Sequence, residues 1–157
     1  MDVSPIIGDT KFNYRVAGII RNKGKILLHK NEKEDFYAIP GGRIKIGEDS
    51  ISAMKREVSE EIEANIIVSD MKAVIENFFE LEGMKYHEVM LVYNVDFEEN
   101  SELYNQEVIK VTEEGKNINF IWEDIDNIKN LNLKPKVLKS LLLEQGNGFV
   151  SKINVDK

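Results

Sequence analysis

The sequence contains no cysteine, and only three of its 157 residues are proline. Without cysteine the chain can form neither a disulfide framework nor a zinc–thiolate site. This composition suits the reducing cytosol, so we expect a cytoplasmic protein. The sequence also lacks an apolar run of membrane-spanning length, and its N-terminal segment lacks the apolar core of a signal peptide. We therefore expect no membrane partner.

Positive charge is also in short supply, because 21 Lys and Arg residues face 28 Asp and Glu residues, which gives a net charge of −7. A non-specific nucleic-acid binder needs a basic face, so this class is disfavoured. The balance fits a protein that meets anionic substrates through a metal ion. The length is enough for one domain with a core and too short for two. We predict a single domain over residues 1–157, with its core at about 12–146 and with residues 1–11 and 147–157 peripheral.

Residues 50–64 are predicted to form one helix. Asp49 precedes it, and a short carboxylate at this position accepts hydrogen bonds from the free N–H groups of the first turn. Ile51, Met54, Val58 and Ile62 recur at steps of three and four residues. They are therefore expected to form one apolar stripe that packs against a core.

Three carboxylates share another face of this helix, because Glu57, Glu60 and Glu61 are spaced i, i+3, i+4. Like charges at this spacing cost a few tenths of a kcal/mol per pair. One explanation is a solvated acidic face. The other is a divalent cation site, since hard cations such as Mg²⁺ prefer oxygen ligands and bind through carboxylates, substrate phosphates and water.

The wider pattern separates these explanations. The motif G-x5-E-x7-R-E-U-x-E-E-x-G-U, in which U is a bulky aliphatic residue, defines the Nudix box, and it is matched here by Gly42, Glu48, Arg56, Glu57, Val58, Glu60 and Glu61. The chain therefore resembles the Nudix hydrolases. It departs from the motif at Glu63 and Ala64, which replace the last glycine and the last aliphatic residue. Because Glu63 is not glycine, we expect the helix to run on to Asn65, which tolerates the left-handed conformation better.

The resemblance implies a Mg²⁺-dependent pyrophosphohydrolase, with Mn²⁺ as an alternative metal. Such an enzyme cleaves a nucleoside diphosphate linked to another moiety by water attack on phosphorus. Nucleoside triphosphates, ADP-ribose, nucleotide sugars and dinucleoside polyphosphates all remain open as substrates. By the same resemblance the metal ligands are Glu57, Glu60 and Glu61, with Glu48 as a further candidate.

The resemblance also gives Arg56 a role, which is to hold the carboxylates through a forked hydrogen bond. The alternative for Arg56 is a surface pair with Glu60. Glu57 or Glu61 is favoured as the general base. Three carboxylates of the acidic loop are further candidates for the base: Glu107, Glu113 and Glu114.

Substrate contacts are expected from residues around the helix. The Pro40-Gly41-Gly42 turn would bring backbone close to a ligand, because glycine adopts unusual backbone angles. Arg15 and Arg43 would contact phosphate, and Glu76 and Glu88 would reach the cleft, with His87 beside Glu88. The alternatives are a solvent-facing Glu76 and an edge charge at Glu88. Tyr37, Phe78 and Trp122 could stack on a base, although such aromatics are more often core, and His29 is expected at the surface.

The remaining pattern predicts an α/β/α sandwich with a mixed β-sheet between helices, which the Nudix resemblance also implies. A hairpin is expected over 12–20 and 26–28, and two long strands over 73–81 and 85–97. Further short strands are expected at 66–68, 108–111 and 120–122. A helical turn is expected at 124–128, and a last helix from Pro135 to Gly146.

A non-catalytic Nudix-fold module that binds or regulates through a nucleotide is the alternative function. Its sign would be the loss of Glu57, Glu60 or Glu61, and all three are present. An isoprenoid diphosphate isomerase ranks last, because by family resemblance that chemistry needs a cysteine. The expected partner is a nucleotide-type small molecule, and the protein is expected to be a monomer or a homodimer.

Overall fold

The computed structural model describes residues 1–113, 115–144, 146 and 148–156. Nine strands occur in these ranges: β1 Ile6–Ile7, β2 Thr10–Asn22, β3 Lys25–Asn31, β4 Gly41–Arg43, β5 Ile66–Leu81, β6 Met84–Phe97, β7 Val108–Glu113, β8 Lys116–Asp124 and β9 Val150–Val155. Two α-helices, α1 Ser50–Ile62 and α2 Leu138–Leu143, and two 3₁₀-helices, η1 Glu102–Asn105 and η2 Ile125–Asn130, complete them. None of the described helices is long and apolar enough to cross a membrane.

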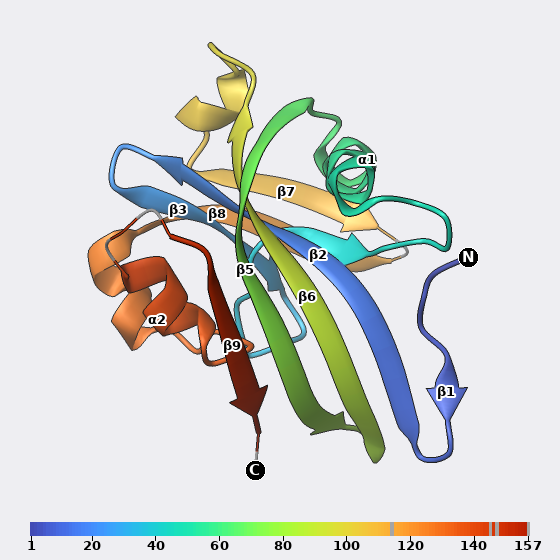
Figure 1. Ribbon diagram of the computed structural model, residues 1–157. Helices are drawn as coiled ribbons and strands as arrows, with labels where there is room; N and C mark the ends of the chain where they lie inside the picture. The colour runs from blue at the N-terminus through green and yellow to red at the C-terminus, as the bar shows by residue number, and fades with distance from the viewer. Residues whose placement is uncertain (114, 145, 147, 157) are drawn as a thin grey trace.

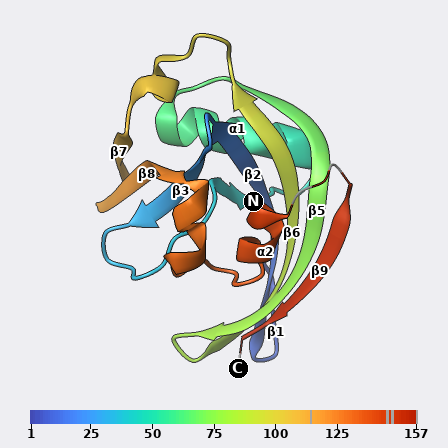
Figure 2. The same cartoon turned by 90° about the vertical axis from the view of Figure 1, so that its left-hand side faces the viewer.

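The strands form one mixed sheet in the order β7-β8-β3-β2-β6-β5-β9, with β1 and β4 paired to β2. α1 lies on one face of the sheet, and α2 and η2 lie on the other (Figures 1 and 2). We call these sides the α1 face and the α2 face. The predicted arrangement of a mixed sheet between helices is confirmed.

The core has two parts, because the residues of each strand alternate between the two faces. Met54 and Val58 of α1 pack with Val16 and Tyr93 on the α1 face. Leucines of α2 pack with apolar residues of β2, β5 and β6 on the α2 face. The predicted stripe of α1 is wrong at Ile51, which is 39% exposed, and Ala53 is buried in its place.

Tight turns fix the two hairpins. Lys23-Gly24 joins β2 to β3, and Glu82-Gly83 joins β5 to β6. Both residues of each turn have positive φ, which is the type I′ geometry that matches the twist of a hairpin. The predicted hairpins are therefore confirmed, but the strand predicted at 66–68 is the start of β5, which continues through irregular register between Val68 and Ala73.

The ends of the chain differ from the prediction. Residues 1–11 include β1, and the N–H of Val3 donates to the carbonyl of Ile44 at 2.9 Å. The segment 147–157, of which Asn147 and Lys157 lie outside the described residues, contains β9, which pairs in parallel with β5 at the edge of the sheet. The last helix is shorter than predicted, since α2 covers only Leu138–Leu143.

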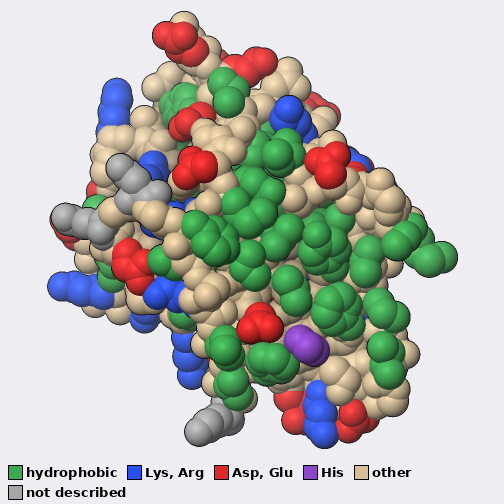
Figure 3. Space-filling model, in the orientation of Figure 1, with side chains coloured by type: hydrophobic (Ala, Val, Ile, Leu, Met, Phe, Trp, Pro, Cys, Tyr) green, Lys and Arg blue, Asp and Glu red, His purple; other side chains and the backbone are tan. Residues whose placement is uncertain are grey.

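Exposed apolar side chains gather on the part of the α1 face that α1 leaves uncovered (Figure 3). His29, by contrast, is not the surface residue that was expected. It is half-buried, and its ring lies edge-on to Phe120 with 5.4 Å between ring centroids.

Candidate functional site

The position of α1 is fixed at both ends. Oδ1 of Asp49 accepts a hydrogen bond from the N–H of Ser52 at 2.8 Å, as the sequence predicts for an N-cap. At the other end Glu63 has φ 52 and ψ 37, and its N–H donates to the carbonyl of Ser59. The predicted extension to Asn65 is wrong, because Glu63 itself adopts the left-handed conformation and ends the helix at Ile62.

The guanidinium of Arg56 connects α1 to its surroundings. Its Nε and Nη2 donate to the two oxygens of Glu48 at 2.7 and 2.9 Å. Its Nη1 donates to Glu57 at 3.0 Å and to Glu60 at 3.3 Å. A last bond of 3.0 Å from Nη2 reaches the carbonyl of Arg43 in β4. The forked bond expected from the sequence is present, and the pair with Glu60 is one contact among several.

The contact with Arg56 keeps Glu48 ionised to lower pH than an ordinary glutamate. Hydrogen bonds from Arg56, together with one of 3.1 Å from the N–H of Lys45, lower the pKa of Glu48 to about 2. Since both of its oxygens accept bonds from Arg56, Glu48 anchors the arginine. A metal would have to use the remaining lone pairs of this carboxylate.

Glu57 lies directly against the backbone of β4. A Cβ at Gly42 would lie 2.2 Å from Cδ of Glu57, and a Cβ at Gly41 would lie 2.1 Å from the carbonyl oxygen of Val16. The predicted Pro40-Gly41-Gly42 turn is wrong, because both glycines belong to a strand and neither has positive φ. Close approach, rather than backbone freedom, makes glycine necessary here.

Burial raises the pKa of Glu57, although Arg56 opposes the shift through a hydrogen bond. The side chains of Glu57 and Glu61 also share a hydrogen bond. Two carboxyl groups in such contact need a proton or a cation between them, because both cannot be ionised at low cost.

The donor chemistry of this cluster fits a hard divalent cation. All donors are carboxylate oxygens, which are the ligands that such a cation prefers, and the missing side chain at Gly42 makes room for the Glu57 carboxyl itself. In the described ranges, however, no three carboxylate or histidine side chains already converge on one point. Glu57 and Glu60 instead bind Arg56. The carboxylates therefore have the right chemistry for a cation, but their side chains would have to rotate to bind it.

A second group of polar side chains crosses the α2 face. Asn13 of β2 pairs with Glu88 of β6, Glu88 with Asn77 of β5, and Asn77 with Asn154 of β9. We call these four residues the polar row. All four are buried, at 2 to 7% exposure. The amide of Asn77 donates to Glu88 at 3.4 Å, and the amide of Asn154 donates to Asn77 at 2.8 Å.

Arg15 borders the polar row, with its Nε 3.9 Å from Oε2 of Glu88. Two buried atoms have no hydrogen-bond partner here, namely Nε of Arg15 and Oδ1 of Asn13. Buried polar groups are rarely left in this state. Arg15 and Glu88, both expected to bind substrate, therefore lie together, and Arg15 has an unused hydrogen-bond donor.

The sequence did not indicate the three asparagines of the polar row. Asn13 and Asn77 interrupt apolar strands, and that interruption is the signal that could have pointed to them. The expectation that His87 and Glu88 share a cleft is wrong, because consecutive strand residues face opposite sides. Glu88 is buried on the α2 face, whereas His87 lies on the α1 face beside the ring of Phe78.

The remaining predicted residues have different surroundings. Glu76 is exposed on the α1 face, with Val89 and Ile153 as its cross-strand neighbours. Arg43 faces Arg15 across β4 and β2, and its Nη1 is 4.0 Å from Asp2. Trp122 is a core residue, and its indole N–H donates to the carbonyl of Leu103 at 2.9 Å.

The acidic-loop residues that were candidates for the general base lie only partly within the described residues. Glu107 is exposed, and its carbonyl accepts a bond from the N–H of Trp122. Glu114 and the side chain of Glu113 lie outside the described residues.

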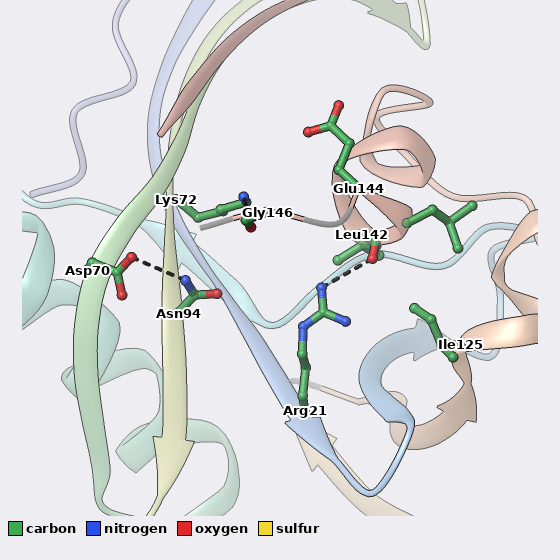
Figure 4. Close-up of a pocket in the computed structure, with 9 residues that line it drawn as sticks. Arg21, Asp70, Lys72, Asn94, Ile125, Leu142, Glu144 and Gly146 are labelled. Atoms are coloured by element: carbon green, nitrogen blue, oxygen red, sulfur yellow. Dashed lines mark hydrogen bonds between the residues drawn. The ribbon is translucent and has the colours of Figure 1, made fainter. Parts of the chain in front are cut away.

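A cavity of about 540 Å³ lies elsewhere, between the end of β2, β5, β6 and α2 (Figure 4). Arg21 donates to the carbonyl of Leu142 at 3.1 Å, and Lys72 donates to the carbonyls of Gly146 and Gly148. Because these cations already bind carbonyls at and beyond the C-terminal end of α2, their role is to hold that end against the sheet.

Comparison with known proteins bears on this geometry. The model of the family described as NUDIX domain matches residues 11–142. Among curated proteins, 8-oxo-dGTP diphosphatase of Buchnera aphidicola subsp. Schizaphis graminum (strain Sg) is 38% identical over 61 residues, which cover 36% of this chain and 47% of that protein. The match thus spans about half the length of that relative.

Solved structures share the fold. A NUDIX hydrolase from Nitrosomonas europaea superimposes with a TM-score of 0.65 at 15% identity, covering 92% of this chain and 79% of that one. The MutT protein from Bacillus halodurans gives a TM-score of 0.63 at 17% identity, covering 91% and 89%. A UDP-X diphosphatase gives 0.61 at 22% identity, covering 88% and 66%. At these identities the likeness extends to the fold alone.

Proposed function

Because the chain belongs to the NUDIX domain family, we propose that it is a metal-dependent pyrophosphohydrolase acting on a nucleotide-type substrate. The substrate is a nucleoside diphosphate linked to another moiety, and Mg²⁺ is the favoured metal. The names of the similar proteins, 8-oxo-dGTP diphosphatase and UDP-X diphosphatase, support a diphosphate linkage as the bond that is cleaved.

One observation carries this proposal: Arg56 binds Glu48, Glu57 and Glu60 at once, while Glu57 lies against the glycine strand. A solvated acidic face would need no such anchoring. Glu57, Glu60 and Glu61 would hold the cation, with Glu48 as a further candidate. When bound, the cation would offset charge on the phosphate oxygens and lower the pKa of a bound water.

The side chains divide the remaining work. Glu57 or Glu61 accepts the proton of the attacking water, and their shared hydrogen bond keeps both carboxyl groups at the same place. Arg56 is a positioning residue, because its bonds orient the carboxylates. Arg15 and Glu88 bind the part of the substrate remote from the cleaved bond, Arg43 contacts phosphate, and the backbone of Gly41 and Gly42 lines the approach.

The test is hydrolysis of a nucleotide panel with Mg²⁺ and with Mn²⁺, with product analysis to show which bond breaks. Glu61→Gln is compared with Glu63→Gln, a matched change at a position that does not share the Glu57 contact. We expect Glu61→Gln to lower turnover by at least about 100-fold, beyond the range typical of residues that only support a metal ligand, and Glu63→Gln to leave it unchanged.

Mn²⁺ binding followed by electron paramagnetic resonance gives a readout that does not depend on turnover. Glu61→Gln should weaken Mn²⁺ binding, and Glu63→Gln should not. If the wild type binds nucleotides but hydrolyses none of the panel, the enzyme proposal is overturned in favour of a binding module.

A further inference from the structure

The α1 face carries a region that no described helix covers. α1 packs over the upper part of this face, and below it β2, β6, β5 and β9 lie side by side in the open (Figure 1). The register places the outward residues in rows across the four strands. One row is Tyr14, Val89, Glu76 and Ile153, and the next is Phe12, His87, Phe78 and Val155.

We call this region the open sheet face: the outward-facing residues among 12–14 of β2, 87–91 of β6, 74–78 of β5 and 151–155 of β9. It is mostly apolar, and Figure 3 shows it as a continuous apolar surface that contains one histidine and one acidic side chain. Ile153 is 67% exposed and Val155 is 56% exposed. Ile7 of β1 borders the same face and is 72% exposed.

The apolar area of the open sheet face is larger than the area that single, scattered apolar residues expose. Two rows on four strands and one row on three correspond to about 350 Å² of flat sheet, from a strand spacing of about 4.8 Å and a rise of about 3.3 Å per residue. The largest apolar patch on a typical monomer is about 300–600 Å², and a patch of this size is often functional. Side-chain relief and Ile7 of β1 extend this face towards the roughly 800 Å² per partner of a standard protein interface.

The charges on the open sheet face are complementary to each other. Among its described residues the acidic and basic side chains are Glu76 and His87, which lie on adjacent strands in adjacent rows. A two-fold axis between them places Glu76 of one copy opposite His87 of the other. Such an isologous contact uses one surface twice and needs no second protein. The face also carries little of the net charge of −7 that would keep two copies apart.

We propose that the open sheet face is the interface of a homodimer, in which the sheets of two copies pack face to face. Sheets pack in this way about 10 Å apart, with apolar side chains interdigitating. A hollow of about 390 Å³ lies at the lower end of the face, and its lining combines apolar residues such as Phe78 and Val155 with the charged side chains of Glu80, Lys85 and Asp156. In the dimer it receives side chains of the second copy. Since α1 lies on the same face, the second copy stands next to α1.

The first test is the mass of the protein by light scattering and sedimentation over a wide concentration range. The wild type is expected at twice the chain mass of 18.0 kDa. Ile153→Asp buries a charge in the interface and should weaken association by at least 100-fold. Ile67→Asp is the matched control, because Ile67 is 56% exposed. Its neighbour Val68 packs on the α1 face, so Ile67 points to the opposite side of the sheet.

A wild type that stays monomeric at all concentrations overturns the proposal. So does a dimer that Ile153→Asp leaves intact, because the contact must then use another surface, such as the outer edge of β9.

A second test holds even if Ile153→Asp destabilises the fold. Because the chain has no cysteine, a single cysteine can be placed and spin-labelled without other changes. The two labelling variants are Ser151→Cys and Ser69→Cys, and both serines are exposed. Ser151 lies at the rim of the open sheet face, and Ser69 of β5 lies farther from that face. The distance between labels in the dimer should be shorter for position 151 than for position 69, and the reverse order overturns the face-to-face arrangement.

Discussion

Arg56 shows how a single side chain turns a repulsive set of charges into an ordered one. Its guanidinium has five N–H donors in a planar fork, and all the contacts described above use that geometry. A lysine would keep the charge but could not bridge Glu48, Glu57 and the carbonyl of Arg43 together.

Arg56→Lys is therefore expected to lower turnover by about 10–100-fold, as is usual when a residue that orients metal ligands is lost. The free energy of unfolding should fall by about 1–3 kcal/mol, because a partly buried Glu48 loses its paired donors. Steady-state kinetics and urea unfolding measure the two effects. Turnover equal to that of the wild type would show that charge alone suffices.

Glu63 is a second position where one residue determines local structure, because its left-handed conformation ends α1. A non-glycine residue in the left-handed conformation costs roughly 1–2 kcal/mol. Glu63→Gly should therefore raise the free energy of unfolding by about 1 kcal/mol, after allowance for the greater freedom of glycine in the unfolded chain. Glu63→Ala removes the same charge but keeps the Cβ, so it should give no gain. Equal effects of the two variants would assign the change to charge instead.

At the scale of elements, the packing of α1 on β4 depends on the absence of a side chain at Gly42. Gly42→Ala is expected to displace the Glu57 carboxyl and to lower turnover by more than tenfold while the fold is retained. Gly148→Ala is the control, because a Cβ there meets nothing within 4 Å. Circular dichroism and kinetics together would separate a displaced carboxylate from a misfolded chain.

Some elements could be predicted from sequence because their signals are local. The cap at Asp49, the turns at Lys23-Gly24 and Glu82-Gly83, and the spacing of Glu57, Glu60 and Glu61 each lie within a few residues. The polar row could not be predicted, because Asn13 of β2 and Asn154 of β9 are far in sequence from Asn77 and Glu88 of the β5–β6 hairpin. Only the register of β2, β6, β5 and β9 brings them together. The family motif has glycine at position 63, where a helix commonly ends in the left-handed conformation, but the sequence did not show that Glu63 would adopt this conformation in its place.

At the scale of the whole molecule, stability should depend on pH through His29. Burial, helped by the nearby charge of Arg15, lowers the pKa of His29 to about 4. In the unfolded chain the pKa of histidine is about 6.5. Between these values the unfolded state binds more protons, so stability is complete above about pH 6.5 and falls as the pH approaches 4, by at most about 3 kcal/mol from this group.

His29→Leu removes this titration and should reduce the loss of stability between pH 6.5 and 4. Urea unfolding of both proteins at several pH values gives the difference between their free energies of unfolding. The contribution of the carboxylates cancels in this difference, because they titrate in both proteins. An identical pH dependence would show that the pKa of His29 is the same in the folded and the unfolded state, which contradicts the prediction.

The pairing of β9 with β5 has a consequence for the order of folding. The residues from Leu81 to Val150 separate the two strands, so their parallel contact closes a very long loop. Such contacts form late, because the entropy of loop closure must be met before they contribute. The β5–β6 hairpin, closed by a two-residue turn, can form long before. Asn77 is therefore part of the sheet before its partner Asn154 arrives. We expect the contact between Asn77 and Asn154, which completes the polar row, to form at the end of the folding reaction.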